Sequence, residues 1–595
     1  MTIDTQTLKQ HVSEAAFENI SKWLNEPKYA EYVNEIEQLV ANQNWQELED
    51  SFFKVLEFGT AGRRGMVGLG SNRINRVTIG ESTQALCLYS SEFDEQARQK
   101  GVVIACDTRL SSPELSRITA EVCAANGFKT YIFDSFRSTP ELSFAVRHLG
   151  AAVGIVVSAS HNPPADNGFK AYWSDGAQLV APHDKGVLAK ADEIQEIHSV
   201  DFDEAVQAGD IILIGDDVDR AYVDAAVNEA VGEYRDIAIV YSPLHGAGQT
   251  NVLPVLERAG FKDVRVVEEQ MTPDGNFPTI PNGKPNPQEI IANEMAVEKL
   301  LAEKADIAIT NDPDADRIGV VALHEGKPVY LNGNQSAALA ADYVLGRLRQ
   351  SGKLTPKHFL AKTIVTTDLL QALTDYYGVK LYGNMLVGMK YIGELIRNKE
   401  TTDEIFLLGG EESYGMIKGT YVRDKDGAAG ALTLAEAAAE LKAANKTLYT
   451  RLLELFVEHG IYEETLVDVQ FPGADGFETM QTIMKQLTSS TPSTLGGYRV
   501  SAVQDYTTLE RRDVETGDVT PVDCISGNVI VFELGDPRRR VTVRPSGTEP
   551  KLKLYVQWYE ETTASNVDEA LEAYDELKSR LDEFTVALKN QVLEG

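Results

Sequence analysis

Residues 157–170 read VSASHNPPADNGFK, a stretch in which a strand-like apolar run passes directly into a polar loop. Gly154 to Val157 is typical of a short buried strand, whereas Asn162-Pro163-Pro164 can continue neither a strand nor a helix. Ser160 and His161 should therefore project from a sharp bend, with Ser160 as an exposed nucleophile. A surface turn whose serine bonds the nearby backbone explains the same string about equally well.

Other strand-like runs alternate with longer amphipathic segments on both sides of this loop. They begin at residues 102, 130, 153, 237, 264, 307 and 405. The alternation indicates α/β layers with mainly parallel sheets, which bind ligands at the carboxyl ends of their strands. Near the C-terminus, VIVFEL, VTVRPS and KLKLYVQWY follow each other closely and precede a helix-like segment at about 566–590. That order predicts a separate α+β domain.

The length of 595 residues predicts several domains, because single hydrophobic cores stop growing well below this size. Helix-like spacing of apolar residues, for example Ile20, Trp23 and Leu24, predicts a helical extension before the first strand. We therefore expect a helical extension, three α/β domains carrying a serine loop, an acidic loop and a GEESYG loop, and a C-terminal domain. Their expected limits are 1–56, 57–220, 221–336, 337–460 and 461–595.

Composition excludes several classes of function. The formal net charge of −34 disfavours a nucleic-acid partner, which would require basic stripes. No stretch approaches the roughly 20 apolar residues of a membrane span, and no secretory signal is visible. The four cysteines lack CxxC spacing, which favours reduced thiols and a cytoplasmic location. An anionic substrate would need local cation clusters to overcome the overall negative charge.

A second chemical signal is TNDPDADRIG at 310–319, in which Asp312, Asp314 and Asp316 alternate. Alternation in an extended or loop segment lets the three carboxylates converge on one side, where they need a cation. The EF-hand pattern fails, because Arg317 stands where glycine is required and Leu323 where glutamate is required. Hard oxygen ligands favour Mg²⁺. The alternative is an acidic, solvated turn.

Two further loops offer groups for a sugar phosphate. VRPSGTEPKLKLY at 543–555 gathers an arginine, two hydroxyls and a lysine around a glycine between two strands, which suits a phosphate dianion. GGEESYG at 409–415 places Glu411 and Ser413 where they can bond vicinal hydroxyls, although a turn or a helix start explains it equally well. Cations near other loops supply local positive potential: Arg63, Arg64, Arg109 and Lys390.

In their order along the chain these segments resemble the α-D-phosphohexomutases, and the resemblance runs from about residue 57 to the C-terminus. It implies four domains, three of them similar, and a phosphorylated Ser160 that binds Mg²⁺ together with Asp312, Asp314 and Asp316. Lys170 and His161 are the implied proton-transfer groups, with Lys170 preferred because neighbouring charges should depress its pKa. Substrate contacts are implied for a larger set: Thr60, Arg64, Arg109, Arg317, Gly388, Lys390, Glu411, Ser413, Lys425, Arg544, Ser546, Gly547 and Thr548.

Two positions depart from the family pattern. Val387 precedes Gly388 where many relatives have threonine, which removes a hydroxyl. Tyr414-Gly415 stands where phosphomannomutase-type relatives carry Gly-His, so a histidine from that loop is not available as an acid or base. The form of the GEESYG loop and the helical extension are most similar to the bacterial α-phosphoglucomutase group, which is also similar to phosphopentomutases and glucose-1,6-bisphosphate synthases.

The resemblance therefore implies a cytoplasmic phosphoglucomutase, a monomer or a homodimer, that uses Mg²⁺ and is activated by glucose 1,6-bisphosphate. Its substrate is a phosphorylated sugar, with no nucleic-acid or membrane partner. Phosphopentomutase, phosphomannomutase and bisphosphate synthase activities stay open as alternatives within the class. A catalytically silent sugar-phosphate-binding protein is the alternative from another class.

Overall fold

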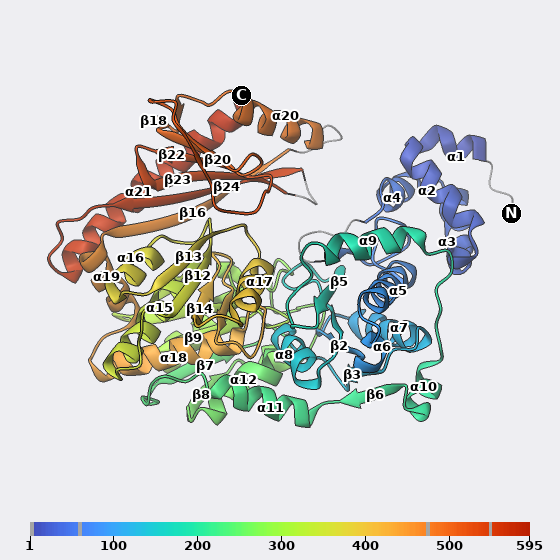
Figure 1. Ribbon diagram of the computed structural model, residues 1–595, viewed down its shortest axis with the longest axis horizontal. Coiled ribbons are helices and arrows are strands. Elements are labelled where there is room, and N and C mark those ends of the chain that lie inside the picture. Colours follow the sequence, from blue (N-terminus) through green and yellow to red (C-terminus); the bar gives the residue numbers. More distant parts are fainter. Residues whose placement is uncertain (1–4, 57–61, 472–475, 547–549, 595) are drawn as a thin grey trace.

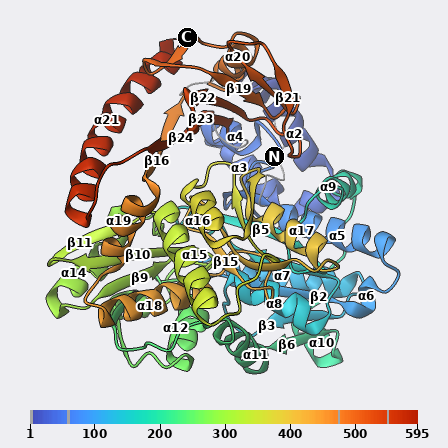
Figure 2. The same ribbon diagram turned by 60° about the vertical axis from the view of Figure 1, so that its left-hand side comes forward.

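The computed structural model describes residues 5–56, 62–471, 476–546 and 550–594. Figures 1 and 2 show a helical lobe at the N-terminus, two neighbouring groups of α/β layers, and a C-terminal domain that lies above them. Its sheets and helices confirm the predicted class, with mixed α/β sheets followed by an antiparallel C-terminal domain. Among the described residues, none of the helices combines the length and apolar character needed to cross a bilayer.

The N-terminal lobe packs around aromatic side chains. Trp23 is buried, stacks on Tyr29 at 4.4 Å between ring centroids, and meets Phe52 edge-on at 5.3 Å. Ile20 lies one turn before Trp23 and is buried in the same cluster, as the helical spacing predicts. The helices are α1 Thr5–His11, α2 Glu14–Asn25, a 3₁₀ turn at Pro27–Tyr32, α3 Val33–Ala41 and α4 Trp45–Phe52.

The first α/β sheet carries the serine loop. Its six strands run in the order β1-β5-β4-β2-β3-β6, and the loop between β4 and β5 contains Ser160. Strands β4, β2, β3 and β6 are parallel, and β5 and β1 extend the sheet at one edge, with β5 paired antiparallel to both β4 and β1. The elements are β1 Arg63–Met66, α5 Arg76–Phe93, α6 Ala97–Lys100, β2 Val102–Cys106, α7 Ser112–Ala125, β3 Thr130–Phe133, α8 Thr139–Leu149, β4 Val153–Val157, β5 Asp166–Trp173, α9 His183–Glu193, α10 Phe202–Ala208 and β6 Ile211–Ile214.

The second sheet carries the acidic loop, which joins the antiparallel neighbours β9 and β10. Its strand order is β11-β10-β9-β7-β8, with β9, β7 and β8 parallel. The elements are α11 Asp216–Val227, β7 Ala238–Ser242, α12 Gly248–Arg258, β8 Asp263–Val266, α13 Glu268–Met271, a 3₁₀ turn at Ile290–Asn293, α14 Glu294–Glu303, β9 Ile307–Asn311, β10 Ile318–His324 and β11 Lys327–Leu331.

The third sheet, in the order β13-β12-β14-β15, carries the GEESYG loop between β14 and β15. Strands β13, β12 and β14 are parallel, so their carboxyl ends reach one edge. The elements are α15 Gly333–Gln350, β12 His358–Thr363, α16 Leu369–Tyr377, β13 Lys380–Met385, α17 Met389–Lys399, β14 Ile405–Gly410, β15 Met416–Lys418, α18 Gly427–Ala443 and α19 Leu448–His459.

The C-terminal domain is a seven-stranded antiparallel sheet in the order β16-β24-β23-β22-β19-β20-β21. The long helix α21 packs against α19 and β16. The elements are β16 Ile461–Gln470, α20 Gly476–Ser489, β17 Thr494–Leu495, β18 Tyr498–Arg499, β19 Ala502–Asp505, β20 Glu510–Asp513, β21 Val519–Pro521, β22 Ile530–Leu534, β23 Asp536–Pro545, β24 Lys551–Glu560 and α21 Val567–Glu594.

Candidate active site

Ser160 lies at the bend after β4, in a backbone conformation that few residues adopt. Its φ is +51°, in the left-handed region where strained residues often serve a function. The backbone N–H of Ser160 donates to Ser158 Oγ at 2.8 Å, and Ser158 Oγ donates to Asp107 at 2.6 Å. Ser160 is only 2% exposed, so the expectation of an exposed nucleophile is wrong. Burial arises because the acidic loop of the second domain packs directly against this bend.

Arg109 binds the backbone of the serine loop. Its guanidinium donates to four backbone carbonyls at 2.6–2.9 Å, and its Nε lies 3.2 Å from a carboxylate oxygen of Asp107. The ring of Phe277, from the second domain, lies 5.3 Å from the guanidinium carbon. The four carbonyls belong to Ser160, Asn162, Pro163 and Asp166. These bonds commit the guanidinium to the loop, which favours a positioning role over the predicted contact with substrate.

The three aspartates of the acidic loop converge as their spacing predicts. Asp312, Asp314 and Asp316 are buried, and ligand oxygens of all three lie within 4.8 Å of one another. Ser160 Oγ donates to Asp312 at 2.5 Å and lies 3.2 Å from His161 Nδ1. The serine loop of the first domain and the carboxylates of the second domain thus form one cluster.

The unpaired oxygens of this cluster fit a hard cation. Asp314 Oδ1 and Asp316 Oδ1 are buried and have no hydrogen-bond partner among the described residues. Buried polar atoms of that kind normally find a partner. Burial, followed by the negative charges of Asp316 and Asp314, raises the pKa of Asp312 well above its ordinary value. A divalent cation would relieve both the missing contacts and the repulsion among the carboxylates.

Cations from three domains surround the carboxylates. Lys170, on β5, lies 2.5 Å from Asp314 and 3.5 Å from Asp316. Lys425 lies 3.2 Å from Asp316, and Arg317 Nε lies 3.9 Å from Asp312. They come from the first, third and second α/β domains, respectively. The local positive charge that an anionic substrate requires is therefore present despite the net charge of the chain.

The pKa of Lys170 moves in the direction opposite to the one predicted from the sequence. Burial disfavours its charged form, but the carboxylates of Asp314 and Asp316 outweigh burial and raise its pKa. The same ion pair, with a hydrogen bond from Thr139 at 2.5 Å, holds the pKa of Asp314 below its usual range in spite of burial. Burial and the neighbouring arginines Arg317 and Arg64 lower the pKa of His161 well below its ordinary value. At neutral pH Lys170 is therefore a cation and His161 a neutral imidazole.

The GEESYG loop adjoins the acidic loop. The backbone N–H of Ile318 donates to the carbonyl of Tyr414 at 3.0 Å, and Arg317 forms a β-bridge with Gly415. Glu411 is buried, and burial raises its pKa to about 7 even though the Lys425 ammonium acts in the opposite direction. Ser413 is half-buried on the same loop. The two loops therefore present Glu411 and the carboxylate cluster to one region.

Most of the remaining predicted residues lie farther along the interface between domains, whereas Arg64 lies near the triad and acts electrostatically with Asp314. Arg544, at the end of β23, acts electrostatically on Glu412 and Tyr391 of the third domain. The backbone N–H of Ser546 donates to the carbonyl of Lys551 at 2.9 Å, where β23 and β24 meet. Gly388 has a φ of +133° and precedes the first residue of α17 as its N-cap, and Lys390 Nζ lies 3.9 Å from Asp184. Arg64 donates to Asn162 of the serine loop at 3.5 Å. Three predicted residues lie outside the described ranges: Thr60, Gly547 and Thr548.

Sequence reasoning missed several groups next to the site. Thr139 bonds Asp314 from the start of α8, and its only signal is a helix-capping pattern that gives no hint of the partner. Glu412 faces Lys553 of the C-terminal domain, and the alternation in KLKLY could have indicated that lysine. Val387 packs against an apolar cluster that includes Tyr506 of the C-terminal domain. The missing hydroxyl at position 387 is therefore replaced by an apolar contact between domains.

The fold and this cluster together define an enzyme of four domains. Its loops bring together a buried serine, a site for a metal cation and several lysine and arginine side chains suited to phosphate chemistry. Comparisons with known proteins agree. Family models described as phosphoglucomutase/phosphomannomutase alpha/beta/alpha domains I, II and III match residues 55–198, 220–325 and 332–457, and the C-terminal domain model matches 506–573. The chain belongs to the phosphoglucomutase/phosphomannomutase family.

Individual relatives support the same assignment. A phosphoglucomutase of Staphylococcus epidermidis is 34% identical, covering 87% of this chain and 93% of its own, and one of Staphylococcus aureus is 34% identical over 86% and 91%. Among solved structures, the Paramecium phosphoprotein pp63/parafusin (phosphoglucomutase) in its open form gives a TM-score of 0.64 at 18% identity, covering 89% of this chain and 95% of its own. A Burkholderia thailandensis family protein gives 0.61 at 22% identity over 90% and 97%.

Proposed function

We infer that this protein is a phosphoglucomutase that interconverts glucose 1-phosphate and glucose 6-phosphate through a phosphorylated Ser160. The contact of Ser160 Oγ with Asp312, inside a buried carboxylate triad ringed by cations, carries this inference. A hydroxyl in that position can hold a phosphoryl group against a cation site. The Staphylococcus relatives named as phosphoglucomutases supply the choice of sugar.

The proposed reaction exchanges one phosphate ester for another. The free hydroxyl of a glucose monophosphate attacks the phosphorus of phospho-Ser160, so that the bond from phosphorus to Ser160 Oγ breaks and a bond to the sugar oxygen forms. The resulting intermediate, glucose 1,6-bisphosphate, reorients in the active site and returns its other phosphate to Ser160. Free glucose 1,6-bisphosphate would recharge a dephosphorylated enzyme, which is why we expect it to act as an activator.

The proton of the attacking hydroxyl needs an acceptor near Ser160. The low pKa of His161 and its distance of 3.2 Å from Ser160 Oγ support a neutral imidazole in that role. Lys170, charged and held between Asp314 and Asp316, suits neutralisation of the phosphoryl oxygens instead. This assignment reverses the order of preference that the sequence suggested.

Mg²⁺ would be held by Asp312, Asp314 and Asp316 together with the phosphoserine, and would supply charge neutralisation at the transferring group. The protein's own contribution is to aim these carboxylates and to keep water away from the ester. Glu411 and Ser413 would hold the sugar hydroxyls. Arg544, Ser546, Gly547 and Thr548 would grip the phosphate that is not reacting.

A coupled assay of glucose 1-phosphate turnover, with Mg²⁺ and a trace of glucose 1,6-bisphosphate, tests the proposal. Ser160→Ala should abolish turnover and the mass increase of one phosphoryl group on the intact protein, whereas Ser199→Ala, an exposed serine, should change neither. Full activity of Ser160→Ala would refute the nucleophile. Comparing kcat/KM for glucose, mannose and ribose phosphates then tests the choice of substrate. A preference for mannose or ribose phosphate would identify the protein as a phosphomannomutase or a phosphopentomutase instead.

A further inference from the structure

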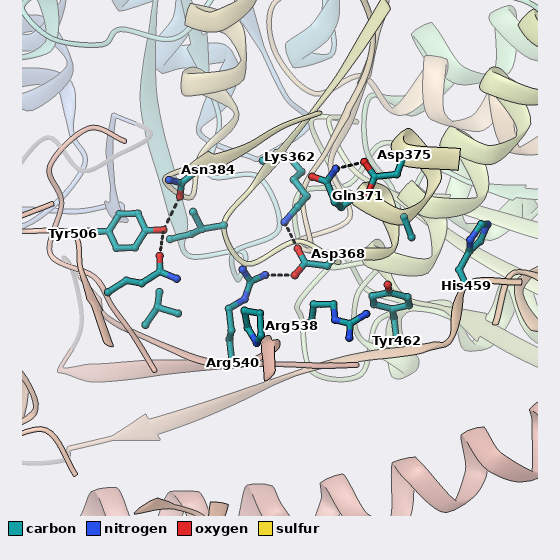
Figure 3. A pocket seen from close by; sticks show the side chains of 16 residues that line it. Lys362, Asp368, Gln371, Asp375, Asn384, His459, Tyr462, Tyr506, Arg538 and Arg540 are labelled. Atoms are coloured by element: carbon teal, nitrogen blue, oxygen red, sulfur yellow. Dashed lines mark hydrogen bonds and ion pairs between the residues drawn. The ribbon is translucent and has the colours of Figure 1, made fainter. Parts of the chain in front are cut away.

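A cavity of about 590 Å³ lies between the third α/β domain and the C-terminal domain. Figure 3 shows the side chains that line it. Strands β12 and β13 and helix α16 form one wall, while β16, β19, β22 and β23 form the other. The volume lies within the range of small-molecule sites. None of its lining residues belongs to the proposed active site.

Two cations in the cavity share a single carboxylate. Lys362 Nζ lies 3.0 Å from one oxygen of Asp368, and a terminal nitrogen of Arg540 lies 2.7 Å from the other. Figure 3 shows both interactions meeting at Asp368 from opposite walls. Arg538 also lines the wall, but its charge is paired with Asp536 at 2.8 Å. The group of Lys362, Arg540 and Asp368 thus keeps a net positive charge.

Nearby acids do not cancel this charge. Glu464 acts electrostatically on Lys362, and burial raises the pKa of Glu464 to about 8, so it is largely uncharged at neutral pH. Asp375 is exposed at the rim, where water screens it. Arg540 Nε is buried and has no hydrogen-bond partner among the described residues. Part of the guanidinium therefore lacks the acceptor that a buried donor normally has.

The rest of the lining mixes neutral polar groups with apolar ones such as Ile364 and Val531. Gln371, Asn384 and Gln504 contribute amides, and Tyr462 and Tyr506 contribute hydroxyls. Such groups both donate and accept hydrogen bonds, as the hydroxyls of a polyol do. We propose that this cavity is a second ligand site, separate from the reaction cleft, which binds a small phosphorylated polyol with its phosphate against Arg540 and Lys362.

A ligand in this site touches both domains at once. Besides the pairing of Asp368 with Arg540, the Tyr506 hydroxyl donates to Asn384 across the interface at 2.6 Å. A phosphate that bonds Arg540 and Lys362 joins the same two walls. Because Arg544 follows Arg540 on β23, occupancy of this site biases the placement of the strand that carries a proposed substrate contact.

The test is binding of glycerol 3-phosphate to the full-length protein, measured by calorimetry and located by hydrogen exchange. Bound ligand should slow exchange in residues 371–375 and 504–506. Arg540→Gln should weaken binding roughly 10- to 100-fold, the usual effect of losing hydrogen bonds to a charged group. Arg539→Gln is the matched control, because this arginine is the neighbour of Arg540 on β23, donates to the carbonyl of Tyr559 at 2.8 Å and does not line the cavity.

A second variant keeps the proposal testable if Arg540→Gln does not fold. Ala372→Met places a larger side chain in the cavity from α16 without changing a charge, and should also weaken binding at least about 10-fold. Protection confined to residues 160–170 and 409–415, no binding at millimolar ligand, or equal affinity for Ala372→Met and wild type would overturn the proposal. Tighter binding of inorganic phosphate than of glycerol 3-phosphate would overturn its polyol part. None of these readouts uses mutase activity, so this proposal and the proposed function can fail independently.

Discussion

Replacing Arg109 with lysine tests whether this residue positions the serine loop or binds substrate. Arginine has five N–H donors, and here four point at loop carbonyls while Nε pairs with Asp107. Lysine has three donors and no planar fork. At least two of these contacts would therefore be lost. At about 1–3 kcal/mol for each unsatisfied buried group, the loop conformation would lose about 2–6 kcal/mol.

The kinetic consequence follows from the position of Ser160 on that loop. A displacement of about 1 Å at a reacting group can cost about 100-fold in rate. We expect Arg109→Lys to lower kcat by about 100-fold, to leave KM within about threefold, and to slow phosphorylation of Ser160 by glucose 1,6-bisphosphate, measured by intact mass. Arg117→Lys, an exposed arginine on α7, is the control. A tenfold or larger rise in KM with kcat unchanged would refute the positioning role and restore Arg109 as a substrate ligand.

Three other perturbations test the site and its scaffold. Removing Mg²⁺ with EDTA should stop turnover reversibly, and Asp314→Asn should raise the Mg²⁺ concentration for half-maximal activity at least about tenfold; an unchanged metal titration would contradict the ligand assignment. Burial raises the pKa of Glu141 from 4.5 to about 7, so the folded chain keeps a proton that the unfolded chain releases, and stability falls as pH rises from about 4.5 to about 7. The free energy of unfolding of Glu141→Gln, measured with urea, should therefore rise by about 3 kcal/mol relative to that of wild type between pH 5 and pH 8. The same pH dependence in both proteins would refute this. Trp23→Ala should destabilise the N-terminal lobe by about 3–5 kcal/mol in the same experiment, and a loss below about 1 kcal/mol would show that its aromatic cluster contributes little.

The parts of the fold that the sequence predicted are those with strong local signals. The runs at 102, 130, 153, 307 and 405 are β2, β3, β4, β9 and β14, because each is a mostly apolar and mostly buried strand. Strands β20 and β21 gave no such signal, since ERRD and VTP lie at an edge where most side chains are exposed or half-buried. Their pairing comes from tertiary contacts, which periodicity does not encode.

The same distinction applies to the site. Spacing predicted that Asp312, Asp314 and Asp316 converge, and they do, but the geometry is that of a turn with Ala315 at a φ of +51° and not of an extended segment. It did not predict the buried environment of Ser160, the raised pKa of Lys170 or the carbonyl contacts of Arg109. Each depends on a partner more than 50 residues away, such as Asp312 for Ser160 and Asp314 for Lys170.

The charges around the triad also bear on why the α/β domains adopt their mutual arrangement. The second domain contributes Asp314 and Asp316, but Lys170 comes from the first domain and Lys425 from the third. Removing one partner of a buried ion pair typically costs about 3–5 kcal/mol, so each domain alone would carry uncompensated charge in this region. The cluster therefore favours the assembled arrangement over separated domains. The same residues that would neutralise a phosphoryl group thus also link the three domains, and a substitution at Lys170 or Lys425 should loosen the domain arrangement as well as slow the reaction.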